Sequence, residues 1–444
     1  MHDALDLREL LSDEVIQRQE SGYDLDTVLP QAEKVLQSDG PRWSAELEQA
    51  YRLLDTASVR PDWPYQEPQD EAAILAVPSA AATIAPPGDH ELADRLHAAW
   101  LGRCAGCNLG KPVEGFGWNR ARLRSYLEQA GSYPISDYLP VLDPMPAGMT
   151  LNPSWRDASR GRISAMARDD DTDYTILGLH MLETYSDRLT PADVGWEWLR
   201  HMPFAQTYTA ERVAYRNLIQ GYEPPQTARV FNPYREWIGA MIRADAFGYA
   251  YPGDPGRAAR LAYQDAALSH TGNGIYGEMW AAGLIAASLA VSSARAAIDA
   301  SMAVIPAGSR LAEAIRDVLA SFDAGATWDQ AFDQVEQRLG HYHWVHTINN
   351  AAAVVAALLW GEGDFSRTIG LAVEAGLDTD CDGATAGSVF GALHGTASLP
   401  GHWTDPLNDR MHSAISGFDN SSIADLAGRT ATIAHQFSST AETR

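Results

Sequence analysis

Apolar residues recur at helical spacing along most of the chain. From Glu91 onward, Ala-rich segments such as "DYTILGLHMLETYS" and "INNAAAVVAALLWGEG" repeat apolar positions every three or four residues. Alternating runs of Val, Ile and Thr, which would predict strands, are almost absent. Thr190 and Ser309 each precede a helical segment at a position typical of an N-cap. The pattern therefore predicts an all-α fold.

The first 88 residues differ from the rest in composition and in the spacing of their apolar residues. Two short amphipathic stretches, "ALDLRELLSDEVIQRQESG" and "SAELEQAYRLLDTA", are followed by the proline-rich "RPDWPYQEPQDE" and by "PSAAATIAPPGDH". The prolines and glycine of the last segment interrupt any helix. We therefore predict an N-terminal helical extension over residues 1–88 and a main all-α domain over residues 89–444.

Charge and composition narrow the possible partners. The chain has 444 residues, a net charge of -25 and 45% hydrophobic residues. An acidic protein with a sizeable core is not expected to bind nucleic acid through phosphate contacts or to bind an anionic membrane surface. The N-terminus lacks a secretory pattern, and three cysteines do not make a disulfide framework. We expect a cytoplasmic protein that acts on a small molecule, and the sequence does not indicate its oligomeric state.

Two clusters of aspartates each precede an apolar helical segment. Asp169, Asp170 and Asp171 lie in "RDDDTDYT", and Asp378, Asp380 and Asp382 lie in "GLDTDCDG". One carboxylate at a helix N-terminus is an ordinary cap, but three adjacent ones repel one another. Divalent cations with oxygen ligands, such as Mg²⁺ and Ca²⁺, would remove this conflict. Either cluster alone is equally compatible with solvated caps, whereas the two together favour metal binding.

Glycines follow the second cluster at every fourth position. Gly383, Gly387, Gly391 and Gly395 fall on one stripe of the predicted helix. A stripe without side chains allows another helix to approach closely. We therefore expect a tight helix pair that brings carboxylates from distant segments together.

These segments resemble the ADP-ribosylglycohydrolase family, of the type that activates dinitrogenase reductase. Three motifs carry the resemblance, in the family's order: "GCNLGKPVE", "DDDT" and "GLDTDC". The resemblance implies a compact orthogonal multi-helix bundle that binds two divalent cations, most often Mg²⁺, for which Mn²⁺ often substitutes. Ca²⁺ stays an alternative because it also prefers carboxylate oxygens. It implies Glu114 as the catalytic acid or base, and it implies four metal ligands: Asp170, Asp171, Asp378 and Asp380.

The chain departs from the family pattern at three motif positions. Cys107 replaces an Asp of the first motif, Asp169 stands where the second has Thr, and Cys381 replaces a ligating Thr of the third. A thiol is a poor Mg²⁺ ligand. Asp169 and Asp382 are therefore added to the candidate ligands as further carboxylates, and Cys381 is kept among the candidates because of its place in the third motif. The pair Cys104 and Cys107 forms a lone CxxC, which we interpret as packed thiols rather than a zinc or redox site.

Further polar residues are candidates for the substrate pocket. By resemblance, "IGAMIR" implies Gly239 and Arg243, and "LSHTGNG" implies His270, with Asn273 beside it. His346 and Asn350 share one helix face and either line the pocket or form a polar helix start. Glu211 is a candidate general base, although an ion pair with Arg216 is the preferred interpretation.

The resemblance implies metal-assisted hydrolysis of an N- or O-glycosidic bond at a ribosyl C1, on an ADP-ribosyl or related substrate. Two alternatives stay open. The altered motif positions and the bulky "FNPYREWIGAMIR" would suit a metal-dependent lyase or hydrolase acting on another small metabolite. A non-catalytic, crystallin-like relative would retain the fold without turnover.

Overall fold

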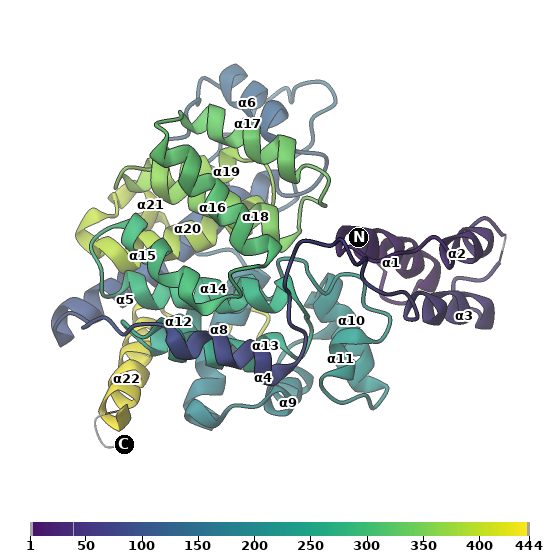
Figure 1. The fold of residues 1–444 in the computed structure, drawn as a ribbon. Coiled ribbons are helices and arrows are strands. Elements are labelled where there is room, and N and C mark those ends of the chain that lie inside the picture. Colours follow the sequence, from purple (N-terminus) through teal and green to yellow (C-terminus); the bar gives the residue numbers. More distant parts are fainter. Residues whose placement is uncertain (1–2, 39, 442–444) are drawn as a thin grey trace.

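Helices make up the regular structure of the protein. The computed structural model describes residues 3–38 and 40–441, and within them the only β-type pairings are isolated bridges, such as the one between Met166 and Met411 (Figure 1). The predicted all-α fold is confirmed. No helix in these residues is both long and apolar enough to span a membrane.

The elements follow one another along the chain as follows. The N-terminal helices are α1 (Leu7–Glu20), α2 (Leu29–Leu36), α3 (Ala45–Leu54) and α4 (Glu71–Ala76). The next group is α5 (Asp89–Gly110), α6 (Arg120–Gln129), α7 (Trp155–Ala158), α8 (Asp170–Tyr185), α9 (Pro191–His201), α10 (Thr209–Ile219) and α11 (Gln226–Arg229). Then come α12 (Asp245–Ala250), α13 (Pro255–Ala266), α14 (Asn273–Ser288), α15 (Ala294–Ser301), α16 (Arg310–Asp323) and α17 (Trp328–Leu339). The last group is α18 (Thr347–Trp360), α19 (Phe365–Glu374), α20 (Thr379–His394), α21 (Gly401–Thr404) and α22 (Ile423–Ala441). Short 3₁₀ helices join them: η1 (Val77–Ala80), η2 (Lys111–Val113), η3 (Ser186–Arg188), η4 (Phe204–Gln206), η5 (Met241–Arg243), η6 (Met302–Val304), η7 (Thr396–Ser398) and η8 (Asp405–Leu407).

Two helices begin at the predicted caps. Thr190 accepts a hydrogen bond from the backbone of Asp193, whose side chain accepts one from the backbone of Thr190 in return. Ser309 accepts from the backbone N–H of Ala312 at 3.2 Å. Each serves amide groups that the first turn of a helix leaves without partners.

Two Ala-rich helices form the centre of the body. Every residue of α14 and of α18 is buried, which explains why these segments are apolar on all sides rather than on one stripe. Figure 1 shows α14 and α18 in the middle of the body, with α16 beside α18, α17 and α19 above them, and α12 and α13 below. The body therefore has helices, rather than a sheet, at its core.

The first three helices lie to one side of the body. Residues between α3 and α5 then run back across it (Figure 1). Glu14 of α1 pairs with Arg235 at 2.6 Å, and Glu67 pairs with Arg310 at 2.9 Å. Buried apolar residues of α1 and α3 belong to the same cluster as those of the body. The boundary at residue 88 stays a prediction.

Candidate metal centre

The three acidic motifs meet at one cavity of about 580 Å³. Glu114 follows η2 at the end of α5, the first aspartate cluster opens α8, and the second opens α20. The cavity is lined by Lys111, Glu114, Asn152, Arg168, Asp169, Asp170, Asp171, Tyr208, Glu211, Trp237, Gly239, Trp344, Asp378, Asp380 and Cys381, among others. Segments separated by more than 200 residues thus contribute to a single site.

A glycine ladder between α5 and α20 brings the first and third motifs together. It consists of Gly102, Gly106 and Gly110 on α5 and Gly383, Gly387 and Gly391 on α20. A Cβ on Gly387 would overlap the carbonyl oxygen of Gly102, and one on Gly383 would overlap that of Gly106. The backbones touch with no side chain between them, as the glycine stripe predicts. Gly395 is outside the ladder, because it ends α20 with a φ of +73°.

Ligand atoms form a continuous series across the cavity. Glu114, Asp378 and Asp380 offer oxygens that all lie within 4.8 Å of one another, and Asp171, Asp380 and Cys381 form a second group at this spacing. A third group consists of Cys107, Asp169 and Asp171. Because Asp380 and Asp171 each belong to two groups, the series has room for more than one cation.

Asp171 provides the clearest fit to a cation. Its side chain is 1% exposed, and its Oδ1 accepts a hydrogen bond from Arg103 at 3.3 Å. Its Oδ2 has no hydrogen-bond partner in the described part of the chain. An ionised oxygen that is buried without a partner is costly. Hard divalent cations take carboxylate oxygens as ligands. The residues present therefore suit Mg²⁺ or a similar ion, and Asp171 is a position where such an ion would satisfy an otherwise unpaired atom.

Lys111 separates Asp169 from the other acids. Its Nζ pairs with Oδ2 of Asp169, whose Oδ1 accepts from the backbone N–H of Asp171 at 2.9 Å. Burial opposes ionisation of Asp169, but Lys111 outweighs it and lowers the pKa of Asp169 to about 2. Asp169 is thus an ionised member of the cavity that already has a cationic partner.

The remaining acids repel one another. Burial, followed by the charge of Asp169, raises the pKa of Asp171 well above its ordinary value and raises that of Asp380 to about 6. Burial, followed by the charge of Asp380, also raises the pKa values of Glu114 and Asp378. Bound cations would relieve this repulsion by favouring the ionised forms.

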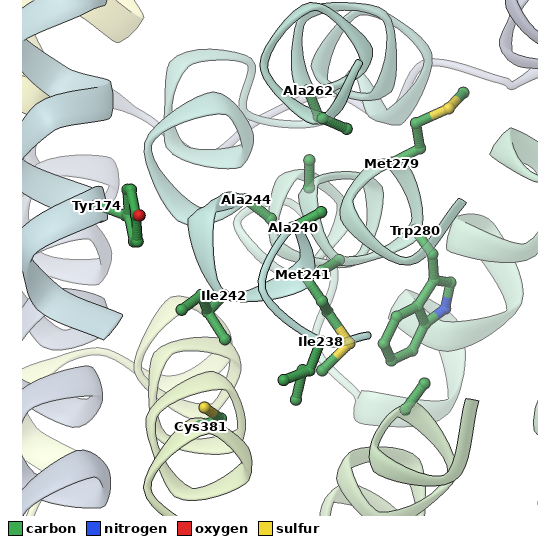
Figure 2. Packing of buried hydrophobic residues seen from close by; sticks show 14 of the residues in the cluster. Tyr174, Ile238, Ala240, Met241, Ile242, Ala244, Ala262, Met279, Trp280 and Cys381 are labelled. Atoms are coloured by element: carbon green, nitrogen blue, oxygen red, sulfur yellow. The ribbon is translucent and has the colours of Figure 1, made fainter. Parts of the chain in front are cut away.

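Cys381 lies at the border between the cavity and the apolar core. Its Sγ lies near the oxygens of Asp171 and Asp380, and burial raises the pKa of the thiol far above its ordinary value. Figure 2 shows Cys381 on its helix close to Ile242, among buried apolar side chains. Cys104 and Cys107 are buried free thiols, and Cys107 offers a ligand atom near those of Asp169 and Asp171.

Asp170 and Asp382 occupy different environments. Asp170 lines the cavity and is half-buried. Asp382 is fully buried, yet in the described part of the chain it neither lines the cavity nor joins a group of ligand atoms, and both of its oxygens lack partners. Burial raises the pKa of Asp382 strongly, which favours its neutral form. The structure thus brings five of the six clustered aspartates to the cavity.

Gly239 is the one predicted substrate residue that lines the cavity. A Cβ there would overlap the carboxylate of Glu211, which also lines the cavity. Arg243 lies behind them, 1% exposed, and donates to Glu211 at 2.7 Å and to the carbonyl of Gly239 at 3.1 Å. Arg243 therefore positions Glu211 and does not line the cavity itself.

The predicted ion pair between Glu211 and Arg216 is wrong. The two residues are five positions apart on α10, about 140° around the helix. Glu211 faces the cavity and pairs with Arg243. Arg216 instead donates to the carbonyl of Val230 at 3.0 Å and to the side chain of Asn217.

Four other predicted substrate residues lie behind the cavity wall. His270 is buried, its Nδ1 lies 2.8 Å from the hydroxyl of Ser269, and burial together with Arg243 lowers its pKa far below the ordinary value. Asn273 donates to Glu67 and Glu236.

His346 and Asn350 support the start of two helices. His346 caps α18 by accepting from the backbone N–H of Ile348 at 3.2 Å, and burial lowers its pKa to about 3. Asn350 accepts from the backbone N–H of Asp378 at 3.0 Å. Asn350 therefore positions the third motif, while neighbouring Trp344 and Val345 line the cavity.

Several residues that line the cavity were not predicted from the sequence. Asn152, Arg168, Tyr208 and Trp344 line the cavity but belong to none of the three motifs. Lys111 could have been found, because the chain contains only two lysines and this one lies within the first motif. Asn152 donates to Glu114 at 3.1 Å from a loop that carries no recognisable pattern.

The model of one protein family, ADP-ribosylglycohydrolase, matches residues 88–438. The chain belongs to the ADP-ribosylglycohydrolase family. A solved structure titled "ADP-ribosylglycohydrolase-related protein complex" is 19% identical, covers 78% of this chain and 99% of its own, and superposes with a TM-score of 0.48. None of the curated proteins matches the chain. Membership of the ADP-ribosylglycohydrolase family supports an enzyme of glycohydrolase type.

Proposed function

We propose that the protein hydrolyses a glycosidic bond at the C1 atom of a ribosyl group, in a site that holds two divalent cations. The observation that carries this proposal is the series of ligand atoms from Glu114 to Asp171 along one cavity. Asp171, Asp378 and Asp380 would hold the cations, with Asp169, Asp170 and Cys381 beside them. When bound, such cations orient ribose hydroxyls and lower the pKa of a water molecule.

Glu114 is the proposed general acid or base. It lies at one end of the series of acidic residues, next to Asp378 and Asp380, and its Oε2 accepts a hydrogen bond from Asn152. This hydrogen bond fixes the direction of the carboxyl group, and a general acid or base must be oriented toward the atom with which it exchanges a proton. Glu114 would hold or donate the proton that accompanies cleavage at C1.

A second candidate is hydrolysis or elimination on a less anionic nucleoside-like metabolite. Among the described residues, the positively charged side chains that line the cavity are those of Lys111 and Arg168. They already pair with Asp169 and Asp173, respectively. A pyrophosphate would need one of these pairs to open. Trp237 and Trp344 give the wall flat apolar faces that suit an uncharged ring.

Turnover measurements on the full chain test the proposal. The substrates would be O-linked and N-linked ADP-ribosyl conjugates and an uncharged ribonucleoside, with Mg²⁺, Mn²⁺ or Ca²⁺ present and release of the free sugar as readout. Glu114→Gln should lower turnover by about 100- to 10,000-fold and leave cation binding intact. Asp380→Ala should abolish both, and Glu128→Gln, which is exposed on α6, should change neither.

Each experimental outcome supports or refutes one of the candidate functions. Activity on the ribonucleoside alone favours the second candidate. Cation binding without turnover on any substrate favours a non-catalytic relative. Normal turnover in Glu114→Gln refutes the role proposed for this residue, and normal cation binding in Asp380→Ala refutes the metal centre.

A further inference from the structure

We propose that His180, Glu197 and His201 form a second metal site, for a borderline transition-metal ion such as Zn²⁺. His180 lies on α8, and Glu197 and His201 lie one turn apart on α9. This site is separate from the acidic cavity, because His180 is ten residues along α8 from Asp170, or about 15 Å along the helix axis. The inference does not depend on the proposed glycosidase function.

The three ligand atoms have the spacing of a tetrahedral site. Oε2 of Glu197 lies 3.3 Å from Nε2 of His180 and 3.2 Å from Nε2 of His201, and each of the three residues offers a ligand atom within 4.8 Å of those of the other two. Zinc bonds to imidazole nitrogen and carboxylate oxygen are about 2.0–2.2 Å long, which makes the edge of a tetrahedron about 3.3 Å. The two shorter edges match this value.

The oxygen at the centre of the cluster lacks a proton donor. Glu197 is 2% exposed, and its Oε2 receives no hydrogen bond from the described residues although two imidazoles lie beside it. A buried carboxylate oxygen without a partner is costly. A simple ion pair with a protonated histidine would supply a hydrogen bond to this atom, whereas a cation between the three atoms satisfies it directly.

The outer contacts orient the ligands as metal sites require. Nδ1 of His201 faces the carbonyl oxygen of Ser416 at 3.4 Å. Because a carbonyl can only accept, Nδ1 carries the proton, and in the neutral ring Nε2 keeps a free lone pair 3.2 Å from Oε2 of Glu197. The other oxygen of Glu197 accepts from the hydroxyl of Tyr185 at 2.7 Å. Contacts of this kind fix the tautomer and direction of metal ligands.

The site is accessible and would connect two helices. The side chains of His180 and His201 are 24% and 20% exposed, so a fourth ligand can be water. An ion held by both helices would fasten the last turn of α9 to α8, whose first turn carries the aspartates of the cavity. The expected role is structural stabilisation of this helix pair.

Titration with Zn²⁺ and with Co²⁺ as a coloured substitute tests the inference on the full chain in saturating Mg²⁺. The wild type should bind one ion with the strong visible absorption of four-coordinate Co²⁺, and its melting temperature should rise with Zn²⁺ concentration. Changes in outer contacts of metal sites cost about 10–100-fold in affinity, so losing a ligand in His180→Ala or His201→Ala should cost at least about 100-fold.

Two variants serve as controls. His412→Ala removes a histidine that lies 3.1 Å from Asp419 on the exposed surface, and it should bind as the wild type does. Asp380→Ala, in the acidic cavity, should retain the Zn²⁺ site. If an alanine variant fails to fold, His180→Gln and His201→Gln replace it. Absence of Zn²⁺ binding in the wild type, unchanged affinity in the histidine variants, or loss confined to Asp380→Ala overturns the inference.

Discussion

Individual buried acids set part of the pH response of the protein. Glu374, the last residue of α19, is buried and accepts from the backbone N–H of Ile135 at 2.9 Å. Burial raises its pKa from 4.5 to about 7. The folded protein therefore binds a proton at this position more tightly than the unfolded chain does, and that contribution to stability is lost as pH rises from about 4.5 to about 7.

Glu374→Gln should stabilise the protein at neutral and alkaline pH. The amide oxygen can still accept from Ile135, and no charge has to be buried. The difference in unfolding free energy from the wild type should be small at pH 4 and should grow to at most roughly 3 kcal/mol at pH 8. Urea unfolding at the two pH values checks this, with Glu128→Gln as an exposed control. An equal difference at both pH values would contradict it.

For single residues, the sequence predicts which chemical group a side chain supplies better than it predicts where that side chain points. Asp171 and Glu114 could be assigned to the site because closely spaced acids and a family motif mark them. Arg243 and His270 carried comparable signals, yet they point into a buried polar network behind the cavity wall. That placement depends on Asp265, which lies in none of the quoted segments, and on Ser269, whose hydrogen bond with Arg243 cannot be predicted from its place in "LSHTGNG".

Among the elements, the pair α5 and α20 determines the shape of the cavity. Their ladder of glycines sets the separation between Glu114, which follows α5, and Asp380, in the first turn of α20. Periodicity was sufficient to predict α20 and its stripe of glycines. The partner helix could not be identified in advance, because close packing depends on complementary positions in α5 some 280 residues earlier.

Gly387→Ala should separate the two helices. The added Cβ would overlap the backbone carbonyl of Gly102, which cannot rotate away. Overpacking of this kind typically costs about 1–3 kcal/mol. We expect a lower unfolding free energy and weaker cation binding, measured by denaturation and calorimetry.

Gly428→Ala on α22 is the matched control for this change. A Cβ at Gly428 would meet no atom within 4 Å, so alanine should stabilise the helix by about 0.5–1 kcal/mol. Wild-type stability and cation affinity in Gly387→Ala would show that α5 and α20 can adjust, and would remove the ladder from the account of the cavity.

For the whole molecule, the N-terminal extension supports the loop that forms one cavity wall. Glu236 in that loop accepts from Gln17 at 2.9 Å and pairs with Arg310 at 2.8 Å, and Arg310 also pairs with Glu67. Trp237 and Gly239, the next residues of the loop, line the cavity. The proline-rich composition predicted only a separate extension over residues 1–88, because contacts between residues more than 200 positions apart leave no local pattern in the sequence.

Glu67→Gln should weaken this connection. Arg310 is buried and would lose one of its two carboxylate partners, so the unfolding free energy should fall by about 2 kcal/mol. Denaturation curves check the value, and Glu71→Gln at an exposed site in the same segment is the control. An unchanged curve would mean that residues 1–88 act independently of the main domain.

The glycine ladder also limits how the gene can vary. Every single-base missense change in a glycine codon introduces a side chain, so conservative replacement is absent at Gly102, Gly106, Gly383 and Gly387, where a Cβ would overlap the backbone of the facing helix. In a saturation-mutagenesis library selected for folded protein, missense variants at these codons should be depleted relative to those at Gly428, where a Cβ meets no atom within 4 Å. The depleted positions should recur every four residues in two segments far apart in the gene, and would thereby reveal the contact between α5 and α20 without a structure.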